Sequence, residues 1–300
     1  NIGASTTQNS TNYTLKETET KTAKTNSSQT PAVKTYTGFN SPSTKTITVD
    51  AKGTTVVNYY YTRKSYTITL TKGTGISSVS GAGTYQYGQI FTISASLATG
   101  YLWNNWTGTS IITNQSYSGN MGAANISYKA NATPNPNTPY KVQHWQQKLG
   151  AATTQNSTNY SLYETDNLKG TTNTSVTPSI KTYKGFNSPS TQTVTISPDG
   201  SRVVNYYYTR KTYTVNYSCG SGATGTAPSS QTVSYGANIT TGANFGSCSK
   251  KGHSTSTWVD PTNVSWTNWT GTWSYDNGQY GISSNILTLY ARWSTCPAGT

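Results

Sequence analysis

The sequence predicts a mainly β protein built from small modules in tandem, and three observations carry this prediction. The first is composition: among 300 residues there are 24 Tyr and 8 Trp, while charged residues make up only 10%. Aromatic and β-branched side chains suit the half-buried surface of a sheet, and this aromatic content argues against disorder. The second is the alternation of apolar and polar residues in short runs bounded by Gly, Asn and Pro. The third is an internal repeat.

The repeat is long. Asn-Tyr-Tyr-Tyr-Thr-Arg-Lys occurs at 58–64 and again at 205–211, and Gly-Phe-Asn-Ser-Pro-Ser-Thr occurs at 38–44 and again at 185–191. Both pairs share an offset of 147 residues. Solenoid repeats have periods of about 20 to 50 residues. We therefore expect a duplicated set of whole domains.

Residues 1–65 form the first module, called here the first A repeat. Alternation predicts strands at Asn12–Thr18, Lys45–Val49 and Thr55–Tyr61. A short helix or turn is expected at Thr30 and Pro31, which suit an N-cap and a first helical residue.

Residues 66–133 form the first B module. Its predicted strands are Tyr66–Leu70, Phe91–Ala95, Gly100–Gly108 and Asn125–Ala132. No Gly or Pro separates the first of these from the preceding Tyr-rich run, so strand should pass directly into strand. The Pro/Asn-rich residues 134–139 are expected to be an extended linker.

Residues 140–212 form the second A repeat, residues 213–294 the second B module, and residues 295–300 a tail. The second A repeat begins with a strand, Tyr140–Gln147, that the first lacks, because Asn1 aligns with Lys148. Two explanations stay open. The matching strand lies upstream of Asn1, or a neighbouring molecule donates it to an open sheet edge.

Certain residues resemble known repeats of bacterial surface proteins. Tyr213–Tyr217, Gly252, Trp258 and Leu287–Trp293 resemble the Listeria–Bacteroides repeats of InlB B-repeat proteins. His253, where an aromatic residue is usual, and the long insertion Val264–Trp273 depart from that pattern. The first B module is similar to divergent B-repeats through its Gly81–Gly88 and Gly100–Trp106 segments, and the A repeats are similar to MucBP-like (mucin-binding protein) repeats.

The resemblance implies β-grasp, ubiquitin-like modules with little helix, strung like beads along an exported bacterial protein. It places the chain outside the cell, at the cell surface or attached to the cell wall. The expected function is that of a non-catalytic adhesin stalk or spacer that binds glycan or a host surface. The alternative is a self-associating subunit of an extracellular surface filament.

The charge balance is strongly basic, with 21 Lys and Arg against 8 Asp and Glu. Such a charge attracts polyanionic polymers such as acidic glycans, although bases scattered over solvated strands would also aid solubility alone. No Lys/Arg-rich run indicates nucleic-acid binding, and no run of about 18 apolar residues indicates a membrane span. Residues 1–5 lack the features of a signal peptide, which would lie upstream or have been removed.

The residues predict neither an enzyme nor a cofactor or metal site. His144 and His253 lie in different modules, and no His, Cys, Asp or Glu cluster has metal-ligand spacing. Gly220–Gly225 matches G-x-G-x-x-G, but no amphipathic helix follows, so it predicts a hairpin turn. One covalent alternative is an autocatalytic isopeptide bond built from three residues that surface charge explains equally well: Lys141, Asn205 and Glu164.

The cysteines lie only in the second B module and its tail. Cys219 follows a predicted strand and Cys248 lies in the loop before Gly252, so we expect a disulfide between them in an extracellular protein. Cys296 is then free or paired beyond Thr300. The alternative is three buried thiols.

The binding candidates are aromatic residues. Tyr206 and Tyr208 share one face of a predicted strand with Arg210. Flat rings that can stack on sugars are Trp103, Trp106, Trp266, Trp269 and Trp273. The competing explanation for each is core packing, because modules with few Leu and Phe must build a core from Tyr and Trp.

Overall fold

The computed structural model describes residues 1–242 and 244–297. These residues form β-strands, turns and irregular chain without any helix, so the protein is mainly β as predicted. Within the described ranges, no helix is long and apolar enough to cross a membrane. The chain divides into two compact units, Asn1–Pro136 and Asn137–Thr300. The division falls inside the predicted linker.

The linker itself is not an extended segment, contrary to the prediction. Pro134 ends one strand and Thr138 begins the next, so only residues 135–137 lie between strands, where they form a turn. The physical reason is that strand pairing continues through both prolines at positions that do not require their missing N–H groups.

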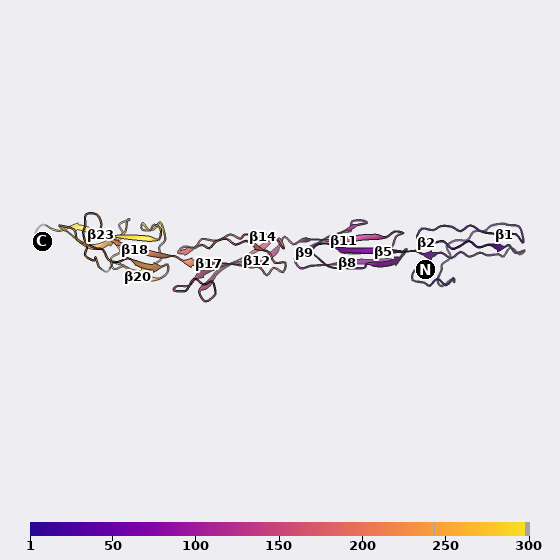
Figure 1. Ribbon diagram of the computed structural model, residues 1–300, viewed down its shortest axis with the longest axis horizontal. Helices are drawn as coiled ribbons and strands as arrows, with labels where there is room; N and C mark the ends of the chain where they lie inside the picture. The colour runs from indigo at the N-terminus through magenta and orange to yellow at the C-terminus, as the bar shows by residue number, and fades with distance from the viewer. Residues whose placement is uncertain (243, 298–300) are drawn as a thin grey trace. The chain divides into compact units, whose positions relative to one another are not determined.

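The first unit contains eleven strands (Figure 1). Its sheets have the orders β1-β3, β2-β4, β10-β8-β6 and β7-β5-β11-β9. The strands are β1 (Ser28–Gln29), β2 (Phe39–Asn40), β3 (Ile47–Thr48), β4 (Thr62–Arg63), β5 (Ser65–Lys72), β6 (Ile76–Ser80), β7 (Gly83–Gln86), β8 (Ile90–Leu97), β9 (Tyr101–Gly108), β10 (Ser116–Asn120) and β11 (Ile126–Pro134).

Within its described residues, 137–242 and 244–297, the second unit contains twelve strands. Its sheets have the orders β13-β12-β17-β15, β14-β16, β19-β18-β23-β21 and β20-β22. The strands are β12 (Thr138–Gln147), β13 (Tyr160–Gly170), β14 (Ser175–Val176), β15 (Phe186–Asn187), β16 (Val194–Thr195), β17 (Val203–Arg210), β18 (Thr212–Ser218), β19 (Gln231–Ser234), β20 (Asn238–Thr240), β21 (His253–Val259), β22 (Thr270–Thr272) and β23 (Ile286–Thr295).

The three four-stranded sheets share one topology. In each, an early and a late strand form a parallel central pair: β5 with β11, β12 with β17, and β18 with β23. Antiparallel strands flank each pair on both sides. A parallel pair needs a long crossover, and the chain between the two central strands supplies the flanking strands. The predicted direct passage of strand into strand is confirmed, because only Lys64 separates β4 from β5 and only Lys211 separates β17 from β18.

The cores are rich in aromatic residues. In β17, Val204, Tyr206 and Tyr208 are buried while Tyr207 between them is half-buried. The cluster in the first B module takes side chains from β5, β8, β9 and β11, including Trp106, and the cluster in the second B module contains three buried Trp. With only four Phe in the chain, Tyr and Trp supply the buried area that other proteins obtain from smaller apolar residues.

Two local predictions for the first A repeat are wrong. No helix forms at Thr30 and Pro31; the Tyr59 hydroxyl donates to the carbonyl of Pro31 at 2.8 Å, which keeps this segment extended. No strand forms over residues 13–24 or 54–61, although their counterparts are β13 and β17. Those two strands both pair with β12, and the first A repeat has no strand in that place.

Candidate functional site

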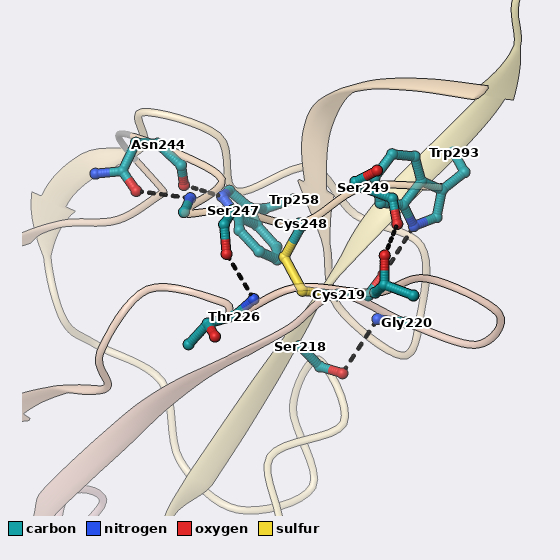
Figure 2. Close-up of a disulfide and its surroundings, with 12 residues drawn as sticks. Ser218, Cys219, Gly220, Thr226, Asn244, Ser247, Cys248, Ser249, Trp258 and Trp293 are labelled. Atoms are coloured by element: carbon teal, nitrogen blue, oxygen red, sulfur yellow. Dashed lines mark hydrogen bonds between the residues drawn. A yellow bond between two sulfur atoms is a disulfide. The ribbon is translucent and has the colours of Figure 1, made fainter. Parts of the chain in front are cut away.

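The predicted disulfide is present in the second B module. Cys219 directly follows β18, Cys248 lies in the loop before β21, and the two Cα atoms are 5.3 Å apart. Figure 2 shows the bridge between two indoles, with Trp293 Nε1 donating to the carbonyl of Cys219 at 2.7 Å and Trp258 Nε1 to that of Asn244 at 2.9 Å. Within the described residues, Cys296 has the free thiol. The disulfide therefore joins the two loops to each other, and the hydrogen bonds from the two indoles hold them beside the core.

Five of the seven aromatic residues predicted to face a ligand are buried, so the prediction is wrong for them. Their exposed fractions are 0% to 3%, and they are Trp106, Tyr206, Tyr208, Trp266 and Trp273. Their role is packing, which was the competing explanation. The physical reason is that each lies on the inward side of its sheet or loop. There, Tyr and Trp rings supply most of the buried apolar surface of the core.

The other two, Trp103 and Trp269, are half-buried and pack against the same cores. Trp103 meets Trp106 edge-on at 5.6 Å between ring centroids, and its Nε1 donates to the carbonyl of Thr113 at 2.6 Å. Trp269 meets Trp266 at 5.1 Å. Neither ring is a free platform for a sugar.

The structure does not assemble the isopeptide alternative. In the sheet, Asn205 pairs with Gln143, whereas Glu164 pairs with His144. Since paired residues share a face and successive residues alternate, Lys141 and Asn205 lie on one face and Glu164 on the other. The proton shuttle that this bond requires is on the wrong side of the sheet.

Glu164 instead belongs to a network on the inner face of the second A repeat. Lys181 Nζ lies 2.8 Å from Asp166 Oδ1 and 2.9 Å from Glu164 Oε2, and the Tyr183 hydroxyl donates to Glu164. Buried His144 places Nδ1 2.9 Å from the Tyr208 hydroxyl and Nε2 3.2 Å from Asp166 Oδ2.

The network favours the ionised forms of its two carboxylates and the protonated form of Lys181. The hydrogen bond from Tyr183 and then that from Lys181 lower the pKa of Glu164. The hydrogen bond from Lys181 also lowers the pKa of Asp166, and its carboxylate partners raise the pKa of Lys181. Such shifts oppose proton transfer near neutral pH. We therefore interpret these contacts as a structural network of hydrogen bonds and ion pairs.

The first A repeat contains the same network of hydrogen bonds and ion pairs without the histidine. Lys34 Nζ lies 2.9 Å from Glu17 Oε2 and 2.6 Å from Glu19 Oε1, and the Tyr36 hydroxyl donates to Glu17. Each residue sits 147 positions before its counterpart. The duplication thus extends from the sequence to individual hydrogen bonds.

The best candidate for a binding site is an open groove of about 420 Å³ in the second A repeat. Its wall is the loop after β15, and its floor comes from β17. Every lining residue is uncharged, and the set is Gln155, Asn187, Ser188, Pro189, Ser190, Thr191, Gln192, Tyr207 and Thr209. The groove is therefore lined by hydroxyls, amides and one phenol ring.

Local hydrogen bonds hold the groove in shape. Asn187 Nδ2 donates to Thr209 Oγ1 at 3.3 Å, and Gln192 Nε2 donates to the carbonyl of Asn205 at 2.8 Å. The Tyr207 ring stacks on Trp145 with 6.0 Å between centroids and an angle of 24° between planes. An aromatic body with adjacent amide donors and acceptors is suited to a polyhydroxylated ligand.

The corresponding loop of the first A repeat has the same bonds. Asn40 Nδ2 donates to Thr62 Oγ1 at 3.2 Å, and Ser41 Oγ donates to the carbonyl of Lys34 at 3.1 Å, as Ser188 does to Lys181 at 3.0 Å. Our sequence interpretation missed this loop. Its signal was the duplicated Gly-Phe-Asn-Ser-Pro-Ser-Thr segment, which is identical over seven residues.

The A repeat and B module of each unit are joined by an arginine. Arg210 Nη1 donates to the carbonyl of Tyr235 at 2.8 Å while its guanidinium lies 5.0 Å from the centre of the Phe186 ring. Arg63 makes the matching contacts to Tyr87 and Phe39.

A carboxylate adds to this junction in the second unit. Asp276 accepts hydrogen bonds from Gly185 N, Lys211 Nζ and Tyr213 OH at 2.7 to 3.0 Å. Burial opposes its ionisation, but these hydrogen bonds hold the pKa of Asp276 well below its usual value. No pattern in the sequence indicated this residue.

The described part of the chain has no group of three or more His, Cys, Asp or Glu that could hold a metal ion. No family model and no curated protein match the sequence. Among solved structures, the chain is similar to the TIE protein of Bacillus anthracis, at 8% identity and a TM-score of 0.31. The match covers 85% of this chain and 58% of the length of that one.

Proposed function

We propose that this chain is a non-catalytic repeat segment of an exported bacterial cell-surface protein, serving as an adhesin stalk or spacer that binds glycan. The observation that carries the proposal is the duplicated loop at 40–45 and 187–192, whose hydrogen bonds recur in both A repeats. In the second A repeat this loop borders the uncharged groove, which the half-buried Tyr207 and the exposed Asn187 help to line.

The modules are proposed to be β-grasp units arranged in tandem, of the MucBP-like and InlB B-repeat types. The shared sheet topology supports this, because a central parallel pair formed by an early and a late strand, flanked by antiparallel strands, is what a β-grasp sheet requires. The arginine junctions support a spacer, since they join successive modules at defined points. The disulfide fits an extracellular location, where such bonds persist.

The test of the glycan proposal is an array of neutral, sialylated and sulfated oligosaccharides probed with the whole chain. We expect the signal to fall at least 10-fold in a variant with both loops changed, Asn40→Ala/Thr44→Ala/Asn187→Ala/Thr191→Ala, and to stay unchanged in a Ser175→Ala variant, whose exposed side chain lies outside the groove. A full signal from the groove variant would reject the groove as the site. Binding only to sulfated or sialylated members, equally lost in 1 M salt, would instead assign it to the net charge of +13.

A second candidate function is a self-associating subunit of an extracellular filament. Large apolar side chains that the first A repeat exposes, Leu15 at 79% and Val56 at 77%, favour it, because exposed apolar surface can mark contacts between chains. Sedimentation at increasing concentration is the test. A concentration-dependent series of oligomers is expected of a filament subunit, and a monomer at the highest concentration would reject that role.

A further inference from the structure

Eight of the nine residues that line the groove of the second A repeat have an identical counterpart in the first. At the offset of 147 positions, the counterparts are Gln8, Asn40, Ser41, Pro42, Ser43, Thr44, Lys45, Tyr60 and Thr62. Only one pair differs, because Lys45 stands where the second A repeat has Gln192. The chemical difference between the two sets of residues is therefore one carboxamide replaced by an ammonium.

The loop that contributes Gln155 to the groove is built in the same way in both A repeats. In the second A repeat, Asn159 Nδ2 donates to the carbonyl of Thr154 at 2.9 Å. In the first, Asn12 Nδ2 donates to the carbonyl of Thr7, also at 2.9 Å. The loop after β15 repeats its hydrogen bonds as well. Both loops that line the groove are therefore held alike in the two repeats.

An edge-on contact between two tyrosine rings joins the first of these loops to the floor of the groove. The centroids of Tyr160 and Tyr207 are 4.9 Å apart, with 76° between the ring planes. Those of Tyr13 and Tyr60 are 4.8 Å apart, with 72° between the planes. Tyr60 and Tyr207 are both half-buried. The first A repeat thus places the floor residue against the loop as the second does.

Lys45 and Gln192 occupy the same place within their loops. Their main-chain N–H groups donate to corresponding tyrosine hydroxyls, both at 3.2 Å. Lys45 Nζ donates to the carbonyl of Asn58 at 2.9 Å. Gln192 Nε2 donates to the carbonyl of Asn205, the counterpart of Asn58, at 2.8 Å. Since backbone and side-chain ends are both fixed alike, the positive charge stands where the groove of the second A repeat has an amide.

The ammonium of Lys45 keeps donors for a ligand. It has three N–H groups, of which one is given to Asn58, and its side chain is exposed. Among the ion pairs of the described residues none includes Lys45, whereas Lys34 of the same repeat is paired with two carboxylates. The other eight residues of the set are uncharged. An ammonium beside hydroxyls and amides favours a ligand with an anionic oxygen group.

The difference between the two repeats is local. Residues 1–65 and residues 140–212 each contain eight Lys and Arg against three Asp and Glu. Net charge therefore attracts a polyanion equally to both repeats. A preference of one repeat over the other must come from where its charges lie, and Lys45 is the charge that differs in the groove residues.

We propose that the two A repeats bind saccharides of different charge. The second binds neutral and acidic saccharides alike, whereas the first prefers a saccharide with an anionic group, a carboxylate or a sulfate ester, which Lys45 Nζ contacts. This inference rests on the proposed function, because it assigns the ligand class of the same groove. One contact between an exposed ammonium and an anion predicts a preference of about 2- to 5-fold.

The experiment measures binding of lactose, sialyllactose and sulfated lactose to two whole chains, each with one groove left. Asn187→Ala/Thr191→Ala leaves the first groove, and Asn40→Ala/Thr44→Ala leaves the second. We expect the chain with the first groove to bind the acidic forms about 2- to 5-fold more tightly than lactose, and the other chain to bind all three equally. The preference should disappear in about 1 M salt, which screens exposed charges.

Exchanging the two residues tests the position itself. Lys45→Gln should remove the preference from the first groove, and Gln192→Lys should create it in the second. Each change introduces the residue that the other repeat already holds at that place. The control, Lys52→Gln, removes the same charge from an exposed turn outside the groove and should leave the preference unchanged. Equal preferences in the two single-groove chains, or an equal effect of Lys52→Gln, would overturn the proposal.

Failure of this inference can be told apart from failure of the proposed function. If each groove binds saccharides but Lys45→Gln leaves the preference unchanged, only the difference between the repeats is rejected. If binding persists in the chain with both loops changed, the glycan site lies elsewhere and both proposals are rejected. A preference for one acidic form alone supports the inference and identifies the anionic group as a carboxylate or a sulfate ester.

Discussion

Single tyrosine hydroxyls connect strands to loops in this protein. In the second A repeat, Tyr206 OH donates to the carbonyl of Pro178 at 2.7 Å and accepts from Gln192 N at 3.2 Å. The first A repeat repeats both bonds through Tyr59, to Pro31 and Lys45. The ring fills the core and the hydroxyl holds the groove loop, so one residue serves both packing and the candidate site.

Tyr206→Phe should lower the free energy of opening β17 by about 1 to 3 kcal/mol, because it leaves a buried carbonyl and an amide without their partner. Hydrogen exchange over residues 203–210 measures this. Tyr207→Phe is the matched control, since that ring is half-buried and should change the same free energy by less than about 0.5 kcal/mol. Equal effects of the two variants would contradict the role given to the Tyr206 hydroxyl.

Asp276 should make the second unit sensitive to acid. Its pKa is lower in the folded chain than in the unfolded chain, so its stabilising contribution is fully present above the unfolded value of about 3.9 and is lost as pH falls below it. The urea midpoint followed by Trp fluorescence should therefore fall more steeply below pH 4 in the wild type than in Asp276→Asn. Parallel curves for the two proteins would count against this assignment.

At the scale of strands and loops, the sequence predicted the long, regular features well. Alternation located β5, β8, β9 and β11, and the offset of 147 residues identified the duplicated A repeats. It failed for residues 13–23 and 54–61, whose pattern is strand-like but which form no strand, whereas their counterparts β13 and β17 both pair with β12. A strand is stabilised by pairing as well as by its own residues, so local pattern alone cannot decide such a case.

The candidate site was harder to predict, because tertiary packing decides which aromatic residues are exposed. Nothing in the sequence distinguishes Tyr206 and Trp273 from exposed aromatic residues, yet both are fully buried in the structure. Asp276 contacts Gly185 across 91 residues, a separation that no local signal spans. The groove loop was visible only as an identical segment in both repeats, and the sequence contained no reason to prefer it to other turns.

The disulfide is the main covalent restraint on the loops of the second B module. It closes a loop of 29 residues, for which the chain-entropy estimate is about 3 to 4 kcal/mol. Cys219→Ser/Cys248→Ser should lower the free energy of unfolding by about that amount, measured by urea with Trp fluorescence. Cys296→Ser, the free thiol, should leave the midpoint unchanged, and a similar loss in that control would argue against the bridge as the cause.

At the scale of the whole molecule, the same A–B combination occurs twice, and each copy is joined in the same way. A Cβ atom on Gly185 would lie 2.1 Å from the Tyr235 ring, and one on Gly38 would lie 2.1 Å from the Tyr87 ring. Glycine at these two positions lets a tyrosine of the following B module lie directly against the backbone of the A repeat. Both units therefore join the A repeat to the B module through the same glycine–tyrosine contact.

Gly185→Ala should disrupt this junction. Gly150→Ala is the matched control, because both residues have positive φ, +78° and +73°, but nothing lies within 4 Å of a Cβ on Gly150. Backbone strain alone should cost about 1 to 2 kcal/mol in both variants, and the clash should add about 1 to 3 kcal/mol in Gly185→Ala only. Hydrogen exchange at β17 and β18 measures the difference. Equal losses would show that Tyr235 moves aside without cost.

The most direct test of the proposed glycan-binding segment is a calorimetric titration with the oligosaccharide that gives the highest array signal. It is added to the wild type, to Asn187→Ala/Thr191→Ala, and to a chain that also carries Asn40→Ala/Thr44→Ala. The duplicated loop predicts two binding sites in the wild type, one in the first variant and none in the second. Binding that keeps its stoichiometry and affinity in the chain with both loops changed would contradict it.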